Sequence, residues 1–136
     1  MKIEFNKYPP NFEAINQTFK LTGNEIFTYG DTIYNPKNFP LHNDLLQHEM
    51  VHMAQQKAEG PEKWWAQYLI DPVFRVAQEI PAYRVQYQVA NATLKDRNKL
   101  AQYLHRLASD LSSPIYGSCI SRNEALAHIQ NTKPIA

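Results

Sequence analysis

Two histidines four residues apart enclose a glutamate in the segment LLQHEMVHMAQQ, which contains His48, Glu49 and His52. On a helix, this H-E-x-x-H spacing places both imidazoles on one face, about one turn apart, where they can share a tetrahedral metal ion. Glu49 then lies beside the metal rather than on it, which suits a base acting on water at the metal. The segment therefore predicts a metal centre equipped to activate water.

So short a pattern also occurs by chance, and His48 and His52 would then be ordinary helix residues. The surrounding segment argues against chance because it is apolar on nearly every side, which predicts a buried helix. Buried histidines beside a carboxylate are costly without strong partners, and metal coordination supplies such partners. The apolar neighbours are Leu45, Leu46, Met50, Val51, Met53 and Ala54.

A catalytic zinc ion usually has three protein ligands and one open position. Glu79 is the expected third ligand, because it lies in the middle of a predicted helix on a face that is otherwise apolar. The alternative for this carboxylate is an ion pair with Arg75 or Arg84 on the same helix. His105 and His128 are weaker candidates for the third ligand position.

Composition restricts the kind of metal site and the kind of partner. The chain has 136 residues and a single cysteine, Cys119, which excludes both an internal disulfide and a cysteine-rich structural zinc site. Its formal charge is +1, with basic and acidic residues evenly scattered, so we expect no nucleic-acid partner and no polybasic membrane anchor. Any zinc must therefore be held by histidine and carboxylate.

The N-terminal segment MKIEFNKYPPNFEAINQTF lacks the apolar core of a signal peptide, and no run of eighteen apolar residues is present. We therefore expect a cytoplasmic protein without a membrane span, although export by another route remains open. The length suits one ordinary domain, and no repeat or linker divides the chain. A single domain over residues 1–136 is the simplest organisation.

The elements that position the site follow from local patterns. The chain begins with a weakly alternating segment at 2–8 and a short helix at 14–19. A hairpin is expected next, with arms at 25–29 and 32–34 around Gly30-Asp31. Helices are expected over 43–58, 61–70, 72–90, 95–112 and 122–131, with Asp71 and the Ser121/Glu124 capping box as start signals. Pro81 predicts a kink or a break after Glu79. The fold class is therefore α+β and mostly helical, with a small N-terminal antiparallel sheet packed on the two site helices.

The H-E-x-x-H helix, a W-W-x-x-Y segment and a following E-x-P-A-Y segment resemble the gluzincins, the zinc metallopeptidases with a glutamate ligand, over about residues 25–90. The closest resemblance is to their minimal versions and to small phage or bacterial metallopeptidase-like domains. It implies a zincin-like domain with one zinc ion per chain, held by His48, His52 and Glu79, and peptide-bond hydrolysis with Glu49 as general base. It also implies that an edge strand near 25–34 pairs with a peptide or protein substrate.

The sequence departs from this family one helical turn after the glutamate ligand. Family members commonly carry an acid there, whereas this chain has Tyr83. Tyr83, or Tyr116 in the segment SSPIYGSC, is a possible hydrogen-bond donor to a ligand or to an oxyanion, and a packing role is the alternative for both. Trp64, Trp65 and Tyr68 are expected in the core or in the cleft wall.

Three alternatives to an active peptidase remain open from the sequence. The first is a non-catalytic zinc-binding or structural domain, which a fourth ligand such as His105 would favour. The second is a zinc amidase acting on peptidoglycan peptides. The third is latency, with the first forty residues or the tail 132–136 covering the cleft. The ligand types fit zinc best, and iron, cobalt or nickel fit the same geometry.

Overall fold

The structure is a computed structural model and describes residues 1–131. It has the predicted α+β, mostly helical class. The elements, in chain order, are β1 (Lys2–Phe5), α1 (Phe12–Thr18), β2 (Phe27–Tyr29), β3 (Thr32–Asn35), α2 (Asn43–Glu59), α3 (Pro61–Ile70), α4 (Pro72–Thr93), α5 (Arg97–Leu111), the 3-10 helix η1 (Pro114–Tyr116) and α6 (Arg122–Gln130).

The sheet has three strands in the order β1-β3-β2. β2 and β3 form the predicted antiparallel hairpin, and Gly30 takes the positive φ of 64° that its turn requires. The expectation of a purely antiparallel sheet was incomplete, because β1 joins β3 in parallel, with Lys2 opposite Thr32. The chain passes through α1 before it enters the hairpin, so β1 and β3 run in the same direction. β2 is left at the edge of the sheet, where it contacts α2.

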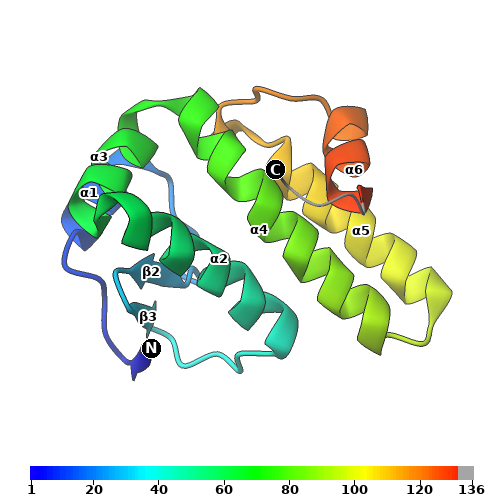
Figure 1. The fold of residues 1–136 in the computed structure, drawn as a ribbon, viewed down its shortest axis with the longest axis horizontal. Helices are drawn as coiled ribbons and strands as arrows, with labels where there is room; N and C mark the ends of the chain where they lie inside the picture. The colour runs from blue at the N-terminus through cyan, green and yellow to red at the C-terminus, as the bar shows by residue number, and fades with distance from the viewer. Residues whose placement is uncertain (132–136) are drawn as a thin grey trace.

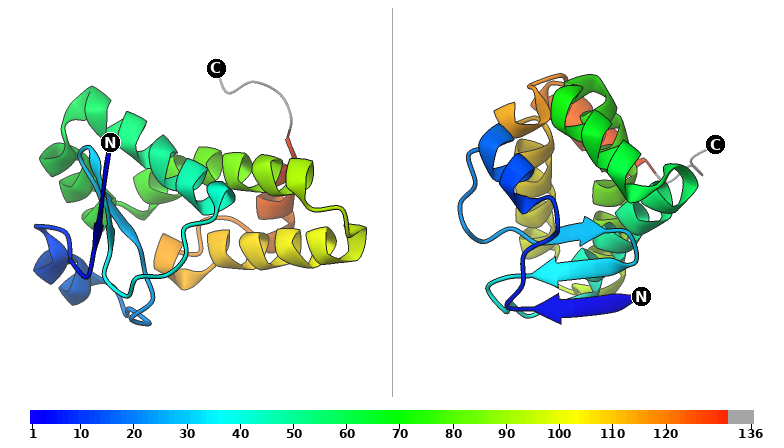
Figure 2. Two further views of the ribbon diagram at one scale, coloured as in Figure 1. Left: turned by 90° about the horizontal axis from the view of Figure 1, so that it is seen from below. Right: turned by 90° about the vertical axis from the view of Figure 1, so that its left-hand side faces the viewer.

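The long helices α2 and α4 pack against each other along much of their length (Figure 1). The sheet, α1 and α3 lie toward one end of this pair, and α5 and α6 lie toward the other (Figures 1 and 2). α4 begins at the predicted N-cap, where the Asp71 carboxylate accepts hydrogen bonds from the backbone N–H groups of Val73 and Phe74, each at 3.1 Å. This arrangement places the middle of α2 opposite the middle of α4.

Pro81 does not break α4, which continues to Thr93. Proline removes one backbone hydrogen bond, but the residues that follow it are anchored by packing: Ala82 is fully buried and Tyr83 is 7 % exposed. The continuous helix keeps Glu79 and Tyr83, four residues apart, on one face. Tyr83 consequently lies within reach of the same region of α2 as Glu79.

Two apolar clusters flank the region between α2 and α4. One joins α4, α5, α6 and η1 around Leu104, Leu107 and Leu111. The other joins α1, β2 and α3, and includes Trp64, Trp65 and Tyr68, which confirms their predicted place in the core or the cleft wall. The space between the clusters is where polar side chains are buried.

The prediction that α2 is buried through its apolar residues was wrong. Its buried residues are polar, namely His48, Glu49, His52 and Gln56, whereas Met50 is 38 % exposed. The face of α2 that turns toward α4 and β2 is the polar one, and those side chains are tolerated there because they contact one another and their neighbours. The most buried part of α2 is therefore the part that carries the H-E-x-x-H chemistry.

The remaining helix signals behave as expected, with one shift. Ser121 and Glu124 form the predicted capping box at the start of α6. α5 starts at Arg97 rather than Lys95, because the Asp96 carboxylate caps it by accepting from two backbone N–H groups. Within residues 1–131, no helix has the length and apolar character needed to cross a membrane. The tail at 132–136, considered above as a cleft cover, lies outside the described residues.

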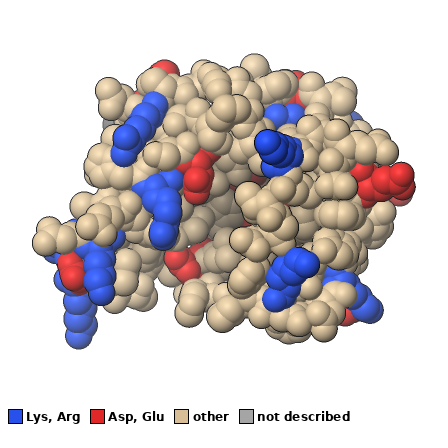
Figure 3. Space-filling model, turned by 180° about the vertical axis from the view of Figure 1, so that it is seen from behind, with Lys and Arg blue, Asp and Glu red and all other residues tan. Residues whose placement is uncertain are grey.

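On the face shown in Figure 3, Lys and Arg side chains lie at several separate places, and some of them lie beside acidic side chains. The same face is hollowed near its middle, with acidic side chains close to the hollow (Figure 3).

Candidate metal centre

His48 and His52 on α2 and Glu79 on α4 meet at one point between the two helices. Glu79 Oε1 lies 2.9 Å from His52 Nε2 and 3.2 Å from His48 Nε2. One potential ligand atom from each residue lies within 4.8 Å of the others, and the three residues are 7 %, 5 % and 3 % exposed. Two imidazole nitrogens and one carboxylate oxygen form the donor set of a three-ligand metal centre. This buried group could hold a metal ion.

The ion-pair alternative for Glu79 is excluded by the partners of the two arginines. Arg75 donates hydrogen bonds to backbone carbonyls, those of Tyr68, Leu69 and Ile115. Arg84 donates to the carbonyl of His128 at 2.8 Å. Within residues 1–131, the ion pairs of Glu79 are formed with His48 and His52 and with neither arginine.

His105 and His128 do not take part in the centre. His105 is exposed on α5, where its Nδ1 accepts a hydrogen bond from Arg122 Nη2 at 3.1 Å. Among residues 1–131, the group able to hold an ion consists of His48, His52 and Glu79 alone. The described chain therefore supplies three candidate protein ligands.

Gln55 orients His52, a role that the sequence analysis did not assign. Its Oε1 accepts a hydrogen bond from His52 Nδ1 at 2.9 Å, and its Nε2 donates to the carbonyl of Gln78 at 2.9 Å. With the proton on Nδ1, the Nε2 lone pair of a neutral His52 faces Glu79 and the candidate ion. The side chain thus links the α2 ligand to the backbone of α4.

We expect Gln55→Ala to weaken metal binding by about 10-fold to 100-fold, the usual effect of losing a hydrogen bond to a histidine ligand. The matched control is Gln47→Ala on the same helix, because Gln47 bonds only to Asn43, at 3.3 Å. Competition against a chromophoric chelator measures the affinity of both variants. Equal affinities for the two variants would remove Gln55 from the support of the site.

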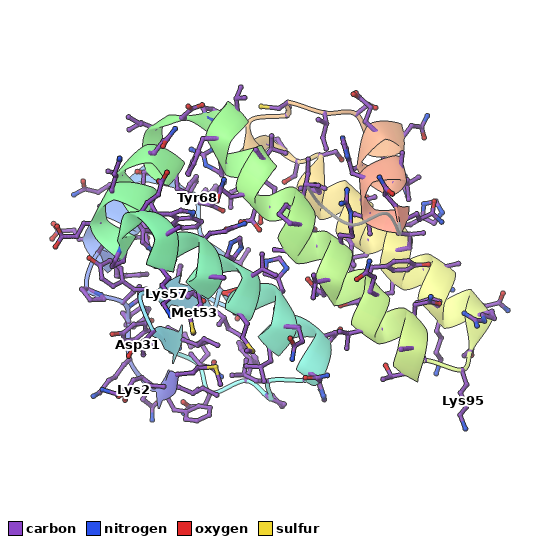
Figure 4. All side chains as sticks on the ribbon, in the orientation of Figure 1. Lys2, Asp31, Met53, Lys57, Tyr68 and Lys95 are labelled. Carbon is purple, nitrogen blue, oxygen red and sulfur yellow. The ribbon has the colours of Figure 1, made fainter. Side chains whose placement is uncertain are left out.

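Tyr68 fixes the other oxygen of Glu79. Its hydroxyl donates a hydrogen bond to Glu79 Oε2, and its side chain extends from α3 into the region between α2 and α4 (Figure 4). Burial first, and then the Glu79 carboxylate, raise the pKa of Tyr68 well above its usual value, so the phenol stays a donor. The carboxylate is therefore held by one oxygen, and the other oxygen is directed at the histidines.

Glu49 lies beside the three ligands without joining them. Its Oε2 is 3.8 Å from His48 Nε2, and its Oε1 accepts a hydrogen bond from Thr28 Oγ1 at 3.3 Å. Burial raises the pKa of Glu49 above its ordinary value. A carboxyl group with a raised pKa binds a proton more readily than an ordinary one does. This is the position that the H-E-x-x-H spacing predicts for the general base.

In the metal-free protein, opposing effects act on the pKa values of the pair His52 and Glu79. Burial lowers the pKa of His52, but the charge and hydrogen bond of Glu79, together with Glu49 and Gln55, outweigh burial and raise this pKa to about 9. Burial would raise the pKa of Glu79, but the charges and hydrogen bonds of His52 and His48 together outweigh burial and hold this pKa well below its usual range. Without a metal, a proton on His52 thus balances the buried carboxylate.

Metal uptake should therefore release protons. A ligating imidazole must be neutral, so binding at pH 7 displaces about one proton from His52. Apparent affinity should rise with pH until about 9, where His52 has lost that proton, and then level off. Calorimetry of zinc uptake in two buffers with different ionisation enthalpies measures the release. A binding heat that is independent of the buffer would contradict the presence of a proton on His52 beside Glu79 in the metal-free protein.

A cavity of about 130 Å³ adjoins the candidate centre and includes its three ligands and Glu49 in the lining. Tyr116 lines this cavity too, and its hydroxyl lies 3.1 Å from the hydroxyl of Tyr83. The Tyr83 ring packs edge-on against His48, with centroids 4.8 Å apart. Burial raises the pKa of both tyrosines well above the usual value, so both phenols remain protonated. The structure thus brings both predicted tyrosines to the edge of the centre.

The edge strand β2 is tied to the site by side chains. The Thr28 carbonyl accepts hydrogen bonds from Gln56 Nε2 at 2.8 Å and from Trp65 Nε1 at 2.9 Å. A carbonyl oxygen has two lone pairs, so this one is fully used. Pairing of a peptide with the strand near 25–34 remains a prediction, and the Thr28 carbonyl is not available for it.

Comparisons of the chain with family models, with curated proteins and with solved structures each find no match. What remains informative about function is the geometry of the centre and the resemblance carried by the three sequence segments.

Proposed function

We propose that the protein is a zinc-dependent hydrolase of peptide bonds, a metallopeptidase of the gluzincin kind. The observation that carries the proposal is the convergence of His48, His52 and Glu79, with Glu49 next to them, on the wall of one cavity. Zinc suits this donor set best, since two imidazoles and a carboxylate are ligands it commonly takes in catalytic sites. A zinc ion bound there supplies a Lewis acid, which acidifies water and polarises a substrate carbonyl.

The side chains around the ligands divide the remaining work. Glu49 takes a proton from the attacking water and returns it to the leaving amine, which its raised pKa favours. Thr28 keeps the Glu49 carboxylate turned toward His48. Tyr116 lines the cavity, and its hydroxyl is hydrogen-bonded to that of Tyr83. Tyr116 donates a hydrogen bond to the substrate oxygen that gains negative charge as the carbonyl is attacked.

A purely structural zinc site is the less favoured alternative. Such sites are closed by four protein ligands, whereas the described residues contribute three. A structural site also has no use for a buried carboxyl group such as Glu49, whose burial without a function costs stability. An open coordination position and an adjacent proton acceptor together favour catalysis.

The test is a digestion experiment with a library of unstructured peptides. The zinc-loaded protein is expected to generate new peptide termini, and the same sample treated with a chelator is expected to generate none until zinc is restored. Mass spectrometry of the digest identifies the cleaved bonds. Zinc-loaded protein that leaves both the peptide library and a set of cell-wall peptides intact would overturn the proposal and favour a non-catalytic zinc domain.

A further inference from the structure

The two oxygens of the Glu79 carboxylate have different partners. Oε1 lies 2.9 Å from His52 Nε2 and 3.2 Å from His48 Nε2, whereas Oε2 accepts the hydrogen bond from the Tyr68 hydroxyl. In general, a carboxylate can bind a metal ion through one oxygen or through both. Because Oε1 faces both imidazole nitrogens, it is the oxygen positioned to share an ion with them. Oε2 is engaged by a side chain that is not among the three candidate ligands.

The Tyr68 side chain is fixed by its neighbours. Its ring stacks on Trp64 with centroids 4.7 Å apart and meets Trp65 edge-on at 5.1 Å. The Arg75 guanidinium carbon lies 5.5 Å from the ring centroid, and Arg75 Nε donates to the Tyr68 carbonyl at 2.8 Å. Figure 4 shows the side chain reaching from α3 into the region between α2 and α4. The hydroxyl is therefore in place before any ion binds, because packing holds the whole side chain.

Glu79 would have to turn to bring both oxygens to one ion. That rotation would draw Oε2 away from the Tyr68 hydroxyl, which is the group's partner in the described chain. Tyr68 is 7 % exposed, so its hydroxyl would lose an acceptor in a buried place, which costs free energy. The hydrogen bond therefore favours the arrangement in which Glu79 offers one oxygen to the ion.

We propose that Tyr68 restricts Glu79 to a single bond with the ion and thereby makes the centre select zinc over ions that prefer six ligands. The inference rests on the proposed function, and it makes Tyr68 a positioning residue that sets the coordination number. Two imidazoles and one carboxylate oxygen provide three donors, and one further position completes the tetrahedral geometry of zinc. Manganese prefers six oxygen-rich ligands, so a second carboxylate oxygen would serve it better.

Cobalt(II) in place of zinc tests this by spectroscopy rather than by turnover. Its visible absorption is strong in a tetrahedral site, which lacks a centre of symmetry, and weak in a site with six ligands. The wild type loaded with cobalt should absorb strongly. Tyr68→Phe keeps the ring and removes the hydroxyl, so Oε2 is released to the ion. The absorption per bound cobalt should then lose most of its intensity, with bound cobalt measured by elemental analysis.

Metal preference provides a second measurement on the same variant. Tyr68→Phe should lower the ratio of zinc affinity to manganese affinity by about tenfold, the lower end of the effect of groups that support metal ligands. Tyr103→Phe is the matched control, because it also removes a hydroxyl bonded to a carboxylate, that of Asp44 at 2.6 Å. Tyr103 belongs neither to the candidate centre nor to the cavity lining, so this variant should keep the wild-type spectrum and ratio.

Several outcomes would overturn the inference and leave the proposed function standing. These are weak cobalt absorption in the wild type, an unchanged spectrum in Tyr68→Phe, and a folded Tyr68→Phe variant that takes up no cobalt. If Tyr68→Phe fails to fold, X-ray absorption spectroscopy of the zinc-loaded wild type counts the donor atoms. Four donors, as in most zinc sites, are expected, and a larger number would overturn the inference. A wild type that takes up neither cobalt nor zinc would overturn the proposed function itself.

Discussion

Replacing Glu49 by glutamine is expected to lower the rate of peptide hydrolysis by at least about 100-fold, the scale of losing a general base. Glutamine keeps the size of the side chain and can still accept the hydrogen bond from Thr28, but it cannot take a proton from water. Zinc content should stay at the wild-type level, because Glu49 is not one of the three ligands. Rates come from a cleaved peptide identified in the digestion experiment, and zinc comes from elemental analysis.

The control for this variant is Glu59→Gln, which makes the same change of charge at an exposed position on α2. It should hydrolyse peptide at the wild-type rate. If Glu49→Gln kept most of the activity while zinc was retained, Glu49 would not be the base, and another group of the cavity would have to accept the proton.

Replacing Glu79 by alanine is expected to lower zinc affinity by more than about 100-fold, because losing a ligand exceeds the 10-fold to 100-fold loss seen for groups that only support ligands. Among residues 1–131, Glu79 is the α4 residue of the candidate centre, and its two oxygens connect both histidines to Tyr68. Competition with a chromophoric chelator gives the affinity. Activity at limiting zinc should fall in parallel.

Two controls make this result specific. Glu62→Ala removes an exposed carboxylate from α3 and should bind zinc as the wild type does. Glu79→Gln removes the charge but keeps the volume of the side chain. A loss of zinc affinity in this variant too would show that the missing charge causes the loss, and not an empty cavity. Circular dichroism of each metal-free variant shows whether the fold persists. Wild-type affinity in a folded Glu79→Ala variant would exclude Glu79 from the centre.

The sequence predicts the local part of the site well. His48, Glu49 and His52 lie within one helical turn of one another, so their relative positions follow from helix geometry alone. Glu79 lies 27 residues beyond His52, and no local rule connects the two. It was found through its residue type, since a carboxylate among core positions needs a cation. Its actual neighbours became known only from the packing of α2 on α4.

The supporting side chains escaped sequence reasoning for a physical reason. Tyr68 has the pattern of a core aromatic, and nothing local shows that its hydroxyl meets a carboxylate from another helix. In the sequence, Thr28 has the pattern of an ordinary strand residue. Only the packing of β2 against α2 brings its hydroxyl to the Glu49 carboxylate. Gln55 did carry a usable signal, because it lies three residues after His52 on one helix. The sequence does not predict which residues of α2 are buried for the same reason, since burial of polar residues depends on partners that are distant in the sequence.

The most direct test of the central claim is the zinc content of the purified protein after incubation with zinc and removal of loosely bound ions, for the wild type beside His52→Ala. A metal centre formed by His48, His52 and Glu79 predicts about one zinc per chain in the wild type and almost none in the variant. A wild type without zinc, or a variant that keeps a full equivalent, would contradict it.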